Sequence, residues 1–201
     1  MTNYVAVSAL ATAIVVNAAS AAEPPAPARP AVAAGIAHYV QAPAGSTLNF
    51  SFQQAGAEDH GEFRQFTTVL DYDEKNLAAS SLKVTVQTGS FETQDKDRND
   101  TLASADLLDP KKFPTAQFVA STFAQGAKGV EAVGKLTLHG VTKDLRVPLT
   151  IKTTATGAEI SGEITLKRLD YGIGQGDWKS TEWVGDEVKL QYKVALIRAA
   201  R

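Results

Sequence analysis

The stretch VKLQYKVAL, residues 188–196, places an apolar side chain at every second position. Successive side chains of a β-strand point to opposite faces, so this period of two predicts a strand that is buried on one face only. Lys189 and Lys193 lie on the other face, toward solvent. Such a strand has to bury its apolar face, and the rest of the chain supplies the strands that cover it.

The same alternation recurs along the chain from residue 46 onward. It is clearest in four further segments, namely 48–52, 82–86, 145–151 and 160–166. More strands are predicted over residues 117–123, 130–138 and 63–72, the last with a bulge or bend between Phe63 and Phe66, where the apolar phase changes. Turn-forming residues separate these segments. The one helix candidate is short, over residues 99–108.

About eight antiparallel strands with one apolar face each form either a sandwich or a closed barrel, and the alternation alone does not choose between them. An eight-stranded barrel is wide enough to enclose one small ligand. In either form the apolar positions face the interior. The residues expected there are Phe50, Phe52, Leu82, Val84, Val86, Leu136, Leu138, Ile164 and Leu166.

Residues 1–22 have the character of a secretory signal peptide, which predicts a periplasmic protein. They carry no charged side chain, and the apolar run 5–16 is followed by small residues that fit a signal-peptidase site at 19–21. The run is shorter than the ~20 residues that span a bilayer, but no basic residue precedes it, so a membrane anchor stays the alternative. Residues 23–35, rich in proline and alanine, form an expected tether, and residues 36–201 form the folded domain.

Composition and motifs exclude several classes of protein. The formal charge of the 201-residue chain is −2, which gives no electrostatic basis for binding nucleic acid. The absence of cysteine excludes disulfides, thiolate metal sites and cysteine nucleophiles. The chain has no G-x-S-x-G, H-E-x-x-H or phosphate-loop motif, and its three histidines are far apart in the sequence. We therefore predict neither an enzyme nor a metal site.

The segment DKDRNDTLASAD, residues 95–106, spaces its acidic residues much like a calcium-binding loop. However, Asp100 stands where that loop needs a glycine for its sharp turn, and Lys96 and Arg98 add positive charge. A solvated acidic turn is the better interpretation, with Asn99 or Asp100 capping the short helix.

Several longer stretches follow one another in a specific order. They are SLKVTVQTGSFETQDKDRNDTL (81–102), SADLLDPKKFPTAQFVAST (104–122), AVGKLTLHGVTKDLRVPLTI (132–151), KRLDYGIG (167–174) and VGDEVKLQYKVAL (184–196). This succession resembles the YceI family of bacterial periplasmic lipid-binding proteins, over about residues 36–198. The chain departs from the family pattern at Thr101, at the pair Leu107 and Leu108, and in the insert 174–182.

The resemblance implies an all-β fold, an eight-stranded antiparallel lipocalin-like barrel with one short helix and a loop at its mouth. It also implies a periplasmic binding or carrier protein for a long isoprenoid lipid, either a polyprenyl chain or an isoprenoid quinone, with no cofactor besides that lipid. Because some relatives accompany b-type cytochromes, a membrane b-type cytochrome is one expected partner, and a homodimer is another expectation. The alternatives are a secreted stress or adhesion barrel without lipid cargo, and a lipid-modifying enzyme that uses the same cavity.

On this interpretation the loop DPKKFPTAQF, residues 109–118, walls the mouth of the tunnel, and Phe113 and Phe118 face lipid. The alternative is a plain turn whose phenylalanines plug the core. Arg168 is expected to point inward, where it pairs with Asp170 or meets a polar head group. The full set of predicted ligand-binding residues is Phe50, Phe52, Phe66, Val84, Phe91, Leu107, Phe113, Phe118, Leu138, Arg168, Tyr171, Trp178 and Trp183.

Overall fold

Antiparallel strands dominate the computed structural model, which describes residues 35–127 and 129–200. The expected signal peptide, 1–22, and the expected tether up to residue 34 lie outside the described residues. The strands are β1 (Ala37–Gln41), β2 (Thr47–Gln54), β3 (Ala57–Phe63), β4 (Phe66–Tyr72), β5 (Ser81–Gln87), β6 (Phe91–Glu92), β7 (Thr115–Gly126), β8 (Gly129–Leu138), β9 (Val141–Thr153), β10 (Gly157–Lys167) and β11 (Val184–Arg198). The helices are α1 (Lys96–Leu102) and the short 3-10 turns η1 (Leu77–Ala79), η2 (Thr88–Ser90), η3 (Arg168–Tyr171) and η4 (Gly176–Lys179).

The sheet closes into a barrel through β11, the strand that contains the alternating stretch 188–196. Around the ring the order is β1-β4-β5-β7-β8-β9-β10-β11, and β11 returns to β1 through the pairs from Gln41–Leu196 to Tyr39–Arg198. The rest of β11 pairs on that side with β2, which leads on to β3 and β6. The closed eight-stranded antiparallel barrel predicted from the family resemblance is confirmed.

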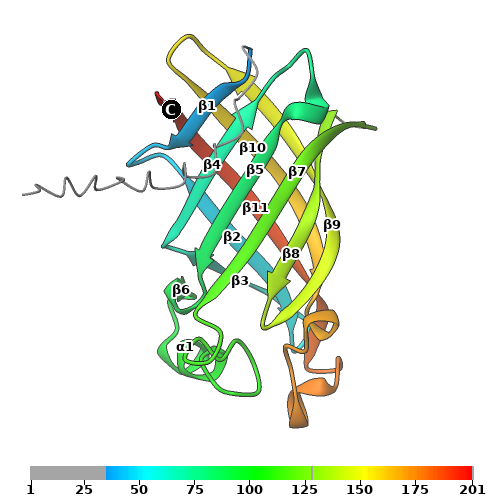
Figure 1. Cartoon of the computed structure of the whole chain (residues 1–201). Coiled ribbons are helices and arrows are strands. Elements are labelled where there is room, and N and C mark those ends of the chain that lie inside the picture. The colour runs from blue at the N-terminus through cyan, green and yellow to red at the C-terminus, as the bar shows by residue number, and fades with distance from the viewer. Residues whose placement is uncertain (1–34, 128, 201) are drawn as a thin grey trace, which may run out of the picture. The chain divides into compact units, whose positions relative to one another are not determined.

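The two ends of the barrel differ (Figure 1). We call the end that carries α1 and the 3-10 turns η3 and η4 the helix end, and the end that carries β1 and the β9–β10 turn the far end. At the helix end the β2–β3 hairpin and the short strand β6 continue the wall, because β6 pairs with β3 at Phe63–Phe91.

Three predicted elements need correction. The helix lies at Lys96–Leu102, because residues 103–112 form turns and Asp109 has a positive φ of 40°. The helix cap is Asp95, whose carboxylate accepts a hydrogen bond from the Arg98 amide at 3.0 Å, so neither Asn99 nor Asp100 plays that part. The predicted strand over 63–72 is two strands, β3 and β4, separated by residues 64–65.

The predicted inward face is confirmed at all nine positions. Phe50, Phe52, Leu82, Leu136 and Leu166 are buried at no more than 9% exposure. The other four, Val84, Val86, Leu138 and Ile164, are half-buried because they line hollow space inside the barrel.

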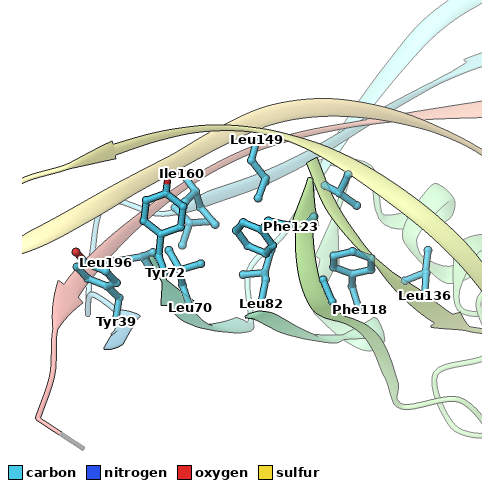
Figure 2. Packing of buried hydrophobic residues seen from close by; sticks show 14 of the residues in the cluster. Tyr39, Leu70, Tyr72, Leu82, Phe118, Phe123, Leu136, Leu149, Ile160 and Leu196 are labelled. Carbon is cyan, nitrogen blue, oxygen red and sulfur yellow. The ribbon is translucent and has the colours of Figure 1, made fainter. Parts of the chain in front are cut away.

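The far half of the barrel is tightly packed (Figure 2). Tyr39, Tyr72 and Phe123 fill its centre, with Leu70 completely buried beside them and the Tyr72 and Phe123 rings 6.2 Å apart. Glycine is required where β8 passes the register shift in β7, because a Cβ at Gly134 would lie 2.1 Å from the Val119 carbonyl oxygen. Large buried side chains therefore fill this half of the barrel.

Candidate functional site

A cavity of about 430 Å³ occupies the helix half of the barrel, and we call it the outer chamber. Strand residues form most of its wall, and residues of the two segments at the helix end cover it. Its apolar lining comprises Leu48, Phe50, Phe52, Phe63, Val86, Leu102, Leu107, Leu108, Ala116, Leu136, Leu138, Leu166, Tyr171, Ile173, Trp178, Val184, Val188 and Leu190. The outer chamber is thus an apolar space that can exclude water around a hydrocarbon ligand.

A second hollow of about 120 Å³, the inner chamber, continues toward the centre of the barrel. Phe66, Val84 and Phe118 are among its lining residues, together with Leu82, Leu149 and Ile160. The two chambers share six lining residues, which we call the neck: Leu48, Val86, Ala116, Leu136, Leu166 and Leu190. Because these side chains border both spaces, the two chambers follow one another along the barrel.

Two cover segments close the helix end, residues 94–114 around α1 and residues 168–184 with η3 and η4. Leu107, which is 5% exposed, reaches the outer chamber from the first segment. The Asp106 carbonyl accepts hydrogen bonds from the amides of Gly174 at 2.8 Å and Gln175 at 2.9 Å. These bonds join the two segments into one cover.

Arg168 fastens the second cover segment to the barrel. Its guanidinium donates to the carbonyls of Gly185 (2.9 Å), Ile173 (3.1 Å), Ser180 (3.1 Å) and Val184 (2.8 Å), although the side chain is 5% exposed. Burial lowers the pKa of this guanidinium, and the charge of Asp186 opposes that shift. Five N–H donors in a planar fork suit this role, because carbonyls of the cover segment and of the first residues of β11 converge on one side chain.

The conformation of the segment depends on Arg168 at a second point. Gly174 has a φ of 106°, and a Cβ there would lie 1.8 Å from the Arg168 Nη1 atom. Only glycine fits this position. The loop glycine and the buried arginine therefore form one packing unit.

The inward direction predicted for Arg168 is confirmed, but its predicted partner is wrong. Asp170 pairs with Lys143 at 3.2 Å, and 54% of its side chain is exposed. The 3-10 turn η3 explains the difference, because it begins at Arg168 and turns the following residues away from the strand's alternation. The neighbouring Tyr171 is buried and borders the outer chamber; burial, more than the nearby charge of Asp170, raises the pKa of its hydroxyl.

Polar residues gather where α1 meets the β2–β3 hairpin. The outer chamber is bordered there by Gln54, Asp95, Asp97, Arg98 and Thr101. The Arg98 guanidinium pairs with Asp59 of β3 at 3.0 Å and so links α1 to the barrel wall. With the charge of Arg98 matched by Asp59, the carboxylates of Asp95 and Asp97 give this rim negative character.

Further polar contacts hold α1 in place beside this rim. The Asn99 side chain donates to Glu92 at 2.8 Å, and its oxygen accepts from the Thr93 hydroxyl at 2.8 Å. The first of these bonds is the main reason that the pKa of the Glu92 carboxyl lies below its usual value. The helix is thus attached by side chains of β6 and the following turn, and its one apolar residue, Leu102, is left to cover the chamber.

Ten of the thirteen predicted ligand-binding residues line the two chambers. Around the outer chamber lie Phe50, Phe52, Leu107, Leu138, Arg168, Tyr171 and Trp178, and around the inner chamber lie Phe66, Val84 and Phe118. Whether they contact a ligand stays a prediction.

The other three lie away from both chambers. Trp183 is 72% exposed, and Phe91 pairs through its backbone with Phe63 at the edge of the sheet. Phe113 packs on the His139 ring, with centroids 4.2 Å apart, outside the cavity. The positive φ of Asp109 starts a turn in which the Phe113 amide donates to the Asp109 carbonyl, and this turn directs the ring to the β8–β9 connection.

The sequence interpretation missed several lining residues. Val188 and Leu190 were already part of the alternating stretch, so their inward direction could have placed them in the site. Leu102, Leu108 and Ile173 come from the cover segments, where no period marks a face. Their role becomes visible only once the cover is folded onto the barrel.

Across residues 35–127 and 129–200, the structure contains no group of three or more His, Asp or Glu side chains placed to hold a metal ion.

None of the helices among the described residues has the length and hydropathy needed to cross a bilayer.

Comparison with known proteins shows that residues 39–196 match a family model described as a YceI-like domain. A UPF0312 protein of Pseudomonas aeruginosa is 36% identical over 124 residues, which cover 57% of this chain. The chain spans about 63% of the length of that relative.

Two solved structures have a similar fold. BcnA of Burkholderia cenocepacia aligns with a TM-score of 0.70 and 30% identity, over 75% of this chain and 95% of BcnA. A domain from Saccharophagus degradans, described as a polyisoprenoid-binding domain implicated in plant cell wall breakdown, aligns with a TM-score of 0.64 over 82% of this chain and 99% of its own. Its identity is 16%, so this second likeness concerns the fold alone.

Proposed function

Because the chain belongs to the YceI-like domain family, we propose that it binds an isoprenoid lipid and holds the hydrocarbon chain inside the two chambers. The observation that carries this proposal is the cavity of about 430 Å³, whose lining is mostly apolar and whose polar residues gather mainly at the rim beside α1. The description of the Saccharophagus degradans domain as polyisoprenoid-binding supports the choice of an isoprenoid among hydrocarbon ligands.

Burial alone supplies the affinity in this mechanism. Transfer of a hydrocarbon chain from water to an apolar site is favourable by ~0.8 kcal/mol for each CH₂ group. Branched, unsaturated prenyl units also suit a lining of leucine, valine and phenylalanine side chains, which offers dispersion contacts and no hydrogen bonds. Such a binding protein needs no catalytic group.

The charge of the rim favours a ligand with an uncharged head group. Asp95 and Asp97 border the outer chamber, and the nearby positive charge of Arg98 is paired with Asp59. Arg168 already donates to four carbonyls and is held by the cover segment. A phosphate head would therefore meet like charge, whereas a quinone or an alcohol would not. We propose an isoprenoid quinone or a prenyl alcohol as the ligand class.

The proposed place of action is the periplasm, on the ground of the signal-like sequence at residues 1–22. Fractionation of cells and amino-terminal sequencing test this. A mature amino terminus at Ala22 or Glu23 in the periplasmic fraction supports export, whereas an intact Met1 or Thr2 on the envelope-associated protein contradicts it.

Lipid extraction followed by mass spectrometry tests the ligand directly. Protein purified from its native host without detergent should carry a prenylated neutral lipid in a stoichiometric amount. Recovery of only phospholipid fatty acids, or of no lipid together with failure to bind added prenyl quinones, would refute the proposal.

A matched pair of variants connects the lipid to the cavity. Leu138→Asp places a charge in the outer chamber, and Thr137→Asp places the same charge on the exposed neighbouring position of β8. The first should abolish lipid retention because an unpaired charge in an apolar site is costly, and the second should retain lipid. Leu138→Asn, which adds a polar group without charge, serves if the first variant does not fold. Equal lipid retention by the Leu138 and Thr137 variants would contradict binding in this chamber.

A further inference from the structure

The wall of the barrel is split between β9 and β10. Their ladder ends at the pair Thr150–Ser161, although β9 begins at Val141 and β10 continues to Lys167. Over the rest of their lengths, within the part of the chain that the structure describes, β9 pairs only with β8 and β10 only with β11. We call this unpaired stretch the seam; it comprises residues 141–149 of β9 and 162–167 of β10.

Pro148 and Gly162 explain why the ladder stops. The Pro148 carbonyl oxygen lies against β10, since a Cβ at Gly162 would be 2.6 Å from it. The nitrogen and the carbonyl of a strand residue point to the same side, and a proline nitrogen has no hydrogen to donate there. The carbonyl instead accepts a hydrogen bond from the hydroxyl of Tyr192 on β11, whose side chain crosses β10 at Gly162. A side chain thus closes the seam at this end, in place of the backbone.

The seam lies beside the inner chamber. Leu145 and Val147 of β9 line that chamber from one edge of the seam, and Ile164 and Leu166 of β10 line it from the other. Leu166 also borders the outer chamber. Because the two edges share no ladder along this stretch, moving them apart widens the barrel without breaking hydrogen bonds between strands.

The contacts that hold the seam at the helix end are few and partly exposed. Lys143 of β9 pairs with Asp170 at 3.2 Å, and their side chains are 41% and 54% exposed. The Nδ1 atom of His139 lies 3.2 Å from the Tyr171 carbonyl oxygen. An ion pair so accessible to water contributes little to stability, so this end of the seam is weakly closed.

The cover is fastened more firmly than the seam. Arg168 donates to four carbonyls, and the Asp106 carbonyl accepts hydrogen bonds from two amides of the second cover segment. A hydrocarbon that passed under the cover would require these bonds to break, and a buried carbonyl left without a donor is costly. Separation of β9 and β10 is therefore the less costly way into the barrel.

We propose that the seam is a side gate: β9 and β10 separate along it, and the hydrocarbon chain passes side-on into the chambers while the cover stays in place. This inference rests on the proposed function, because it specifies the route by which the same site takes up and releases its ligand. A side-on route suits a long, flexible prenyl chain, which then need not be threaded end-first past the cover.

Cross-links across the seam test the gate, since the chain contains no cysteine of its own. Arg146→Cys and Thr165→Cys place one exposed thiol on the outer face at each edge of the seam. The offset of the β9–β10 ladder would set these two positions opposite each other. Thr165→Cys with Lys189→Cys is the matched control, because Thr165 and Lys189 are a direct pair of the β10–β11 ladder. A bismaleimide joins the thiols of the lipid-free protein, and mass spectrometry verifies each bridge.

The measured quantities are the rates of uptake and release of a neutral farnesyl benzoquinone and its dissociation constant. Quenching of Trp178, which borders the outer chamber, follows the binding. The bridge across the seam should slow both rates at least about tenfold, because the strands have to part in each direction. It should leave the dissociation constant within about twofold, because both rates fall together. The control bridge should change none of these quantities.

A bridge across the cover decides between the two routes. Asp106→Cys with Gln175→Cys joins the two cover segments at exposed positions whose backbones are already hydrogen-bonded, and this bridge should leave both rates unchanged. Slower exchange with the cover bridge, or unchanged exchange with the seam bridge, would overturn the side gate. Failure of the quinone to bind the protein without any bridge would instead refute the proposed function.

Discussion

The two halves of the barrel share most of their strands and the same alternation of side chains, yet one half is solid and the other is hollow. In the far half, Tyr39, Tyr72 and Phe123 meet at the centre. In the helix half, Phe50 and Phe52 lie against the wall, with their rings 6.2 Å apart, and leave the centre empty. An inward apolar side chain therefore serves stability in one half and ligand binding in the other.

Small residues explain part of the difference. Ala120, Ala132 and Ala158 are buried in the far half, where they give the large aromatic rings room to interdigitate. The helix half has a different closure, since β2, β3 and β6 form its wall where β1 and β4 pair in the far half. Cover segments, rather than side chains from the strands, then seal it from solvent.

The largest expected effect comes from opening the solid half. Phe123→Ala should lower the free energy of unfolding by about 3–5 kcal/mol, because it leaves a sealed cavity in a packed core. Leu138→Ala, which enlarges an existing chamber, should cost clearly less. Urea unfolding of the lipid-free variants measures both values. Equal losses would mean that the two halves are packed alike and would contradict the distinction between a solid and a hollow half.

A smaller loss of stability is expected from releasing the cover. Arg168→Ala removes the donor of four hydrogen bonds, and each buried carbonyl left without a donor costs about 1–3 kcal/mol unless water reaches it. Because the segment lies at the surface and can hydrate, we expect a total loss of about 2–3 kcal/mol. Arg168→Lys should not restore the loss, since a single ammonium cannot reach four separate carbonyls.

Tryptophan fluorescence reports this release directly, because Trp178 lies in the cover segment and borders the chamber. Arg168→Ala should shift the emission of Trp178 to longer wavelength, over the constant contribution of the exposed Trp183, and expose residues 173–184 to protease well below the unfolding midpoint. Lys167→Ala, on the exposed neighbouring residue, is the control and should change neither. An unchanged emission spectrum in Arg168→Ala would show that the arginine does not hold the segment.

The alternation of side chains was sufficient to predict which faces point inward, and the resemblance to a known family was needed to predict the closed barrel. The nine predicted interior residues do face the interior, because the period of two is a local property of each strand. The alternation could not distinguish the solid half from the hollow one, since that depends on how side chains from non-neighbouring strands meet across the barrel. The inward direction of Arg168 was likewise predictable, whereas its partners were not: they are main-chain carbonyls up to 17 positions away along the chain, and any residue type supplies a carbonyl.

The position of Phe113 was not predictable for a related reason. The composition of the loop 109–118 indicated a rigid apolar turn, but the direction of the ring depends on the positive φ of Asp109, a residue type that adopts such angles only in particular turns. Leu107, a few residues earlier, does reach the outer chamber. The short segment 107–113 thus contains both kinds of apolar residue, one that packs on a neighbouring turn and one that lines the cavity.

Phe113 and Leu107 therefore test, within one short segment, the difference between an apolar residue that serves packing and one that lines the cavity. The expected effect on stability is the smallest of the series. Phe113→Ala removes a half-buried ring that packs on His139 and covers Gly140, where a Cβ would lie 2.8 Å from the Phe113 ring. We expect a loss of about 1–2 kcal/mol in unfolding free energy and no change in the affinity for a prenyl quinone. Leu107→Ala, in contrast, should lower the affinity for the quinone about tenfold or more, because it removes a contact with the ligand.

Urea midpoints of the lipid-free proteins and fluorescence titrations with one quinone give the stability and the affinity of both variants. A tenfold loss of affinity in Phe113→Ala would return that ring to the wall of the site, and the turn at Asp109 would then have to rearrange when lipid binds.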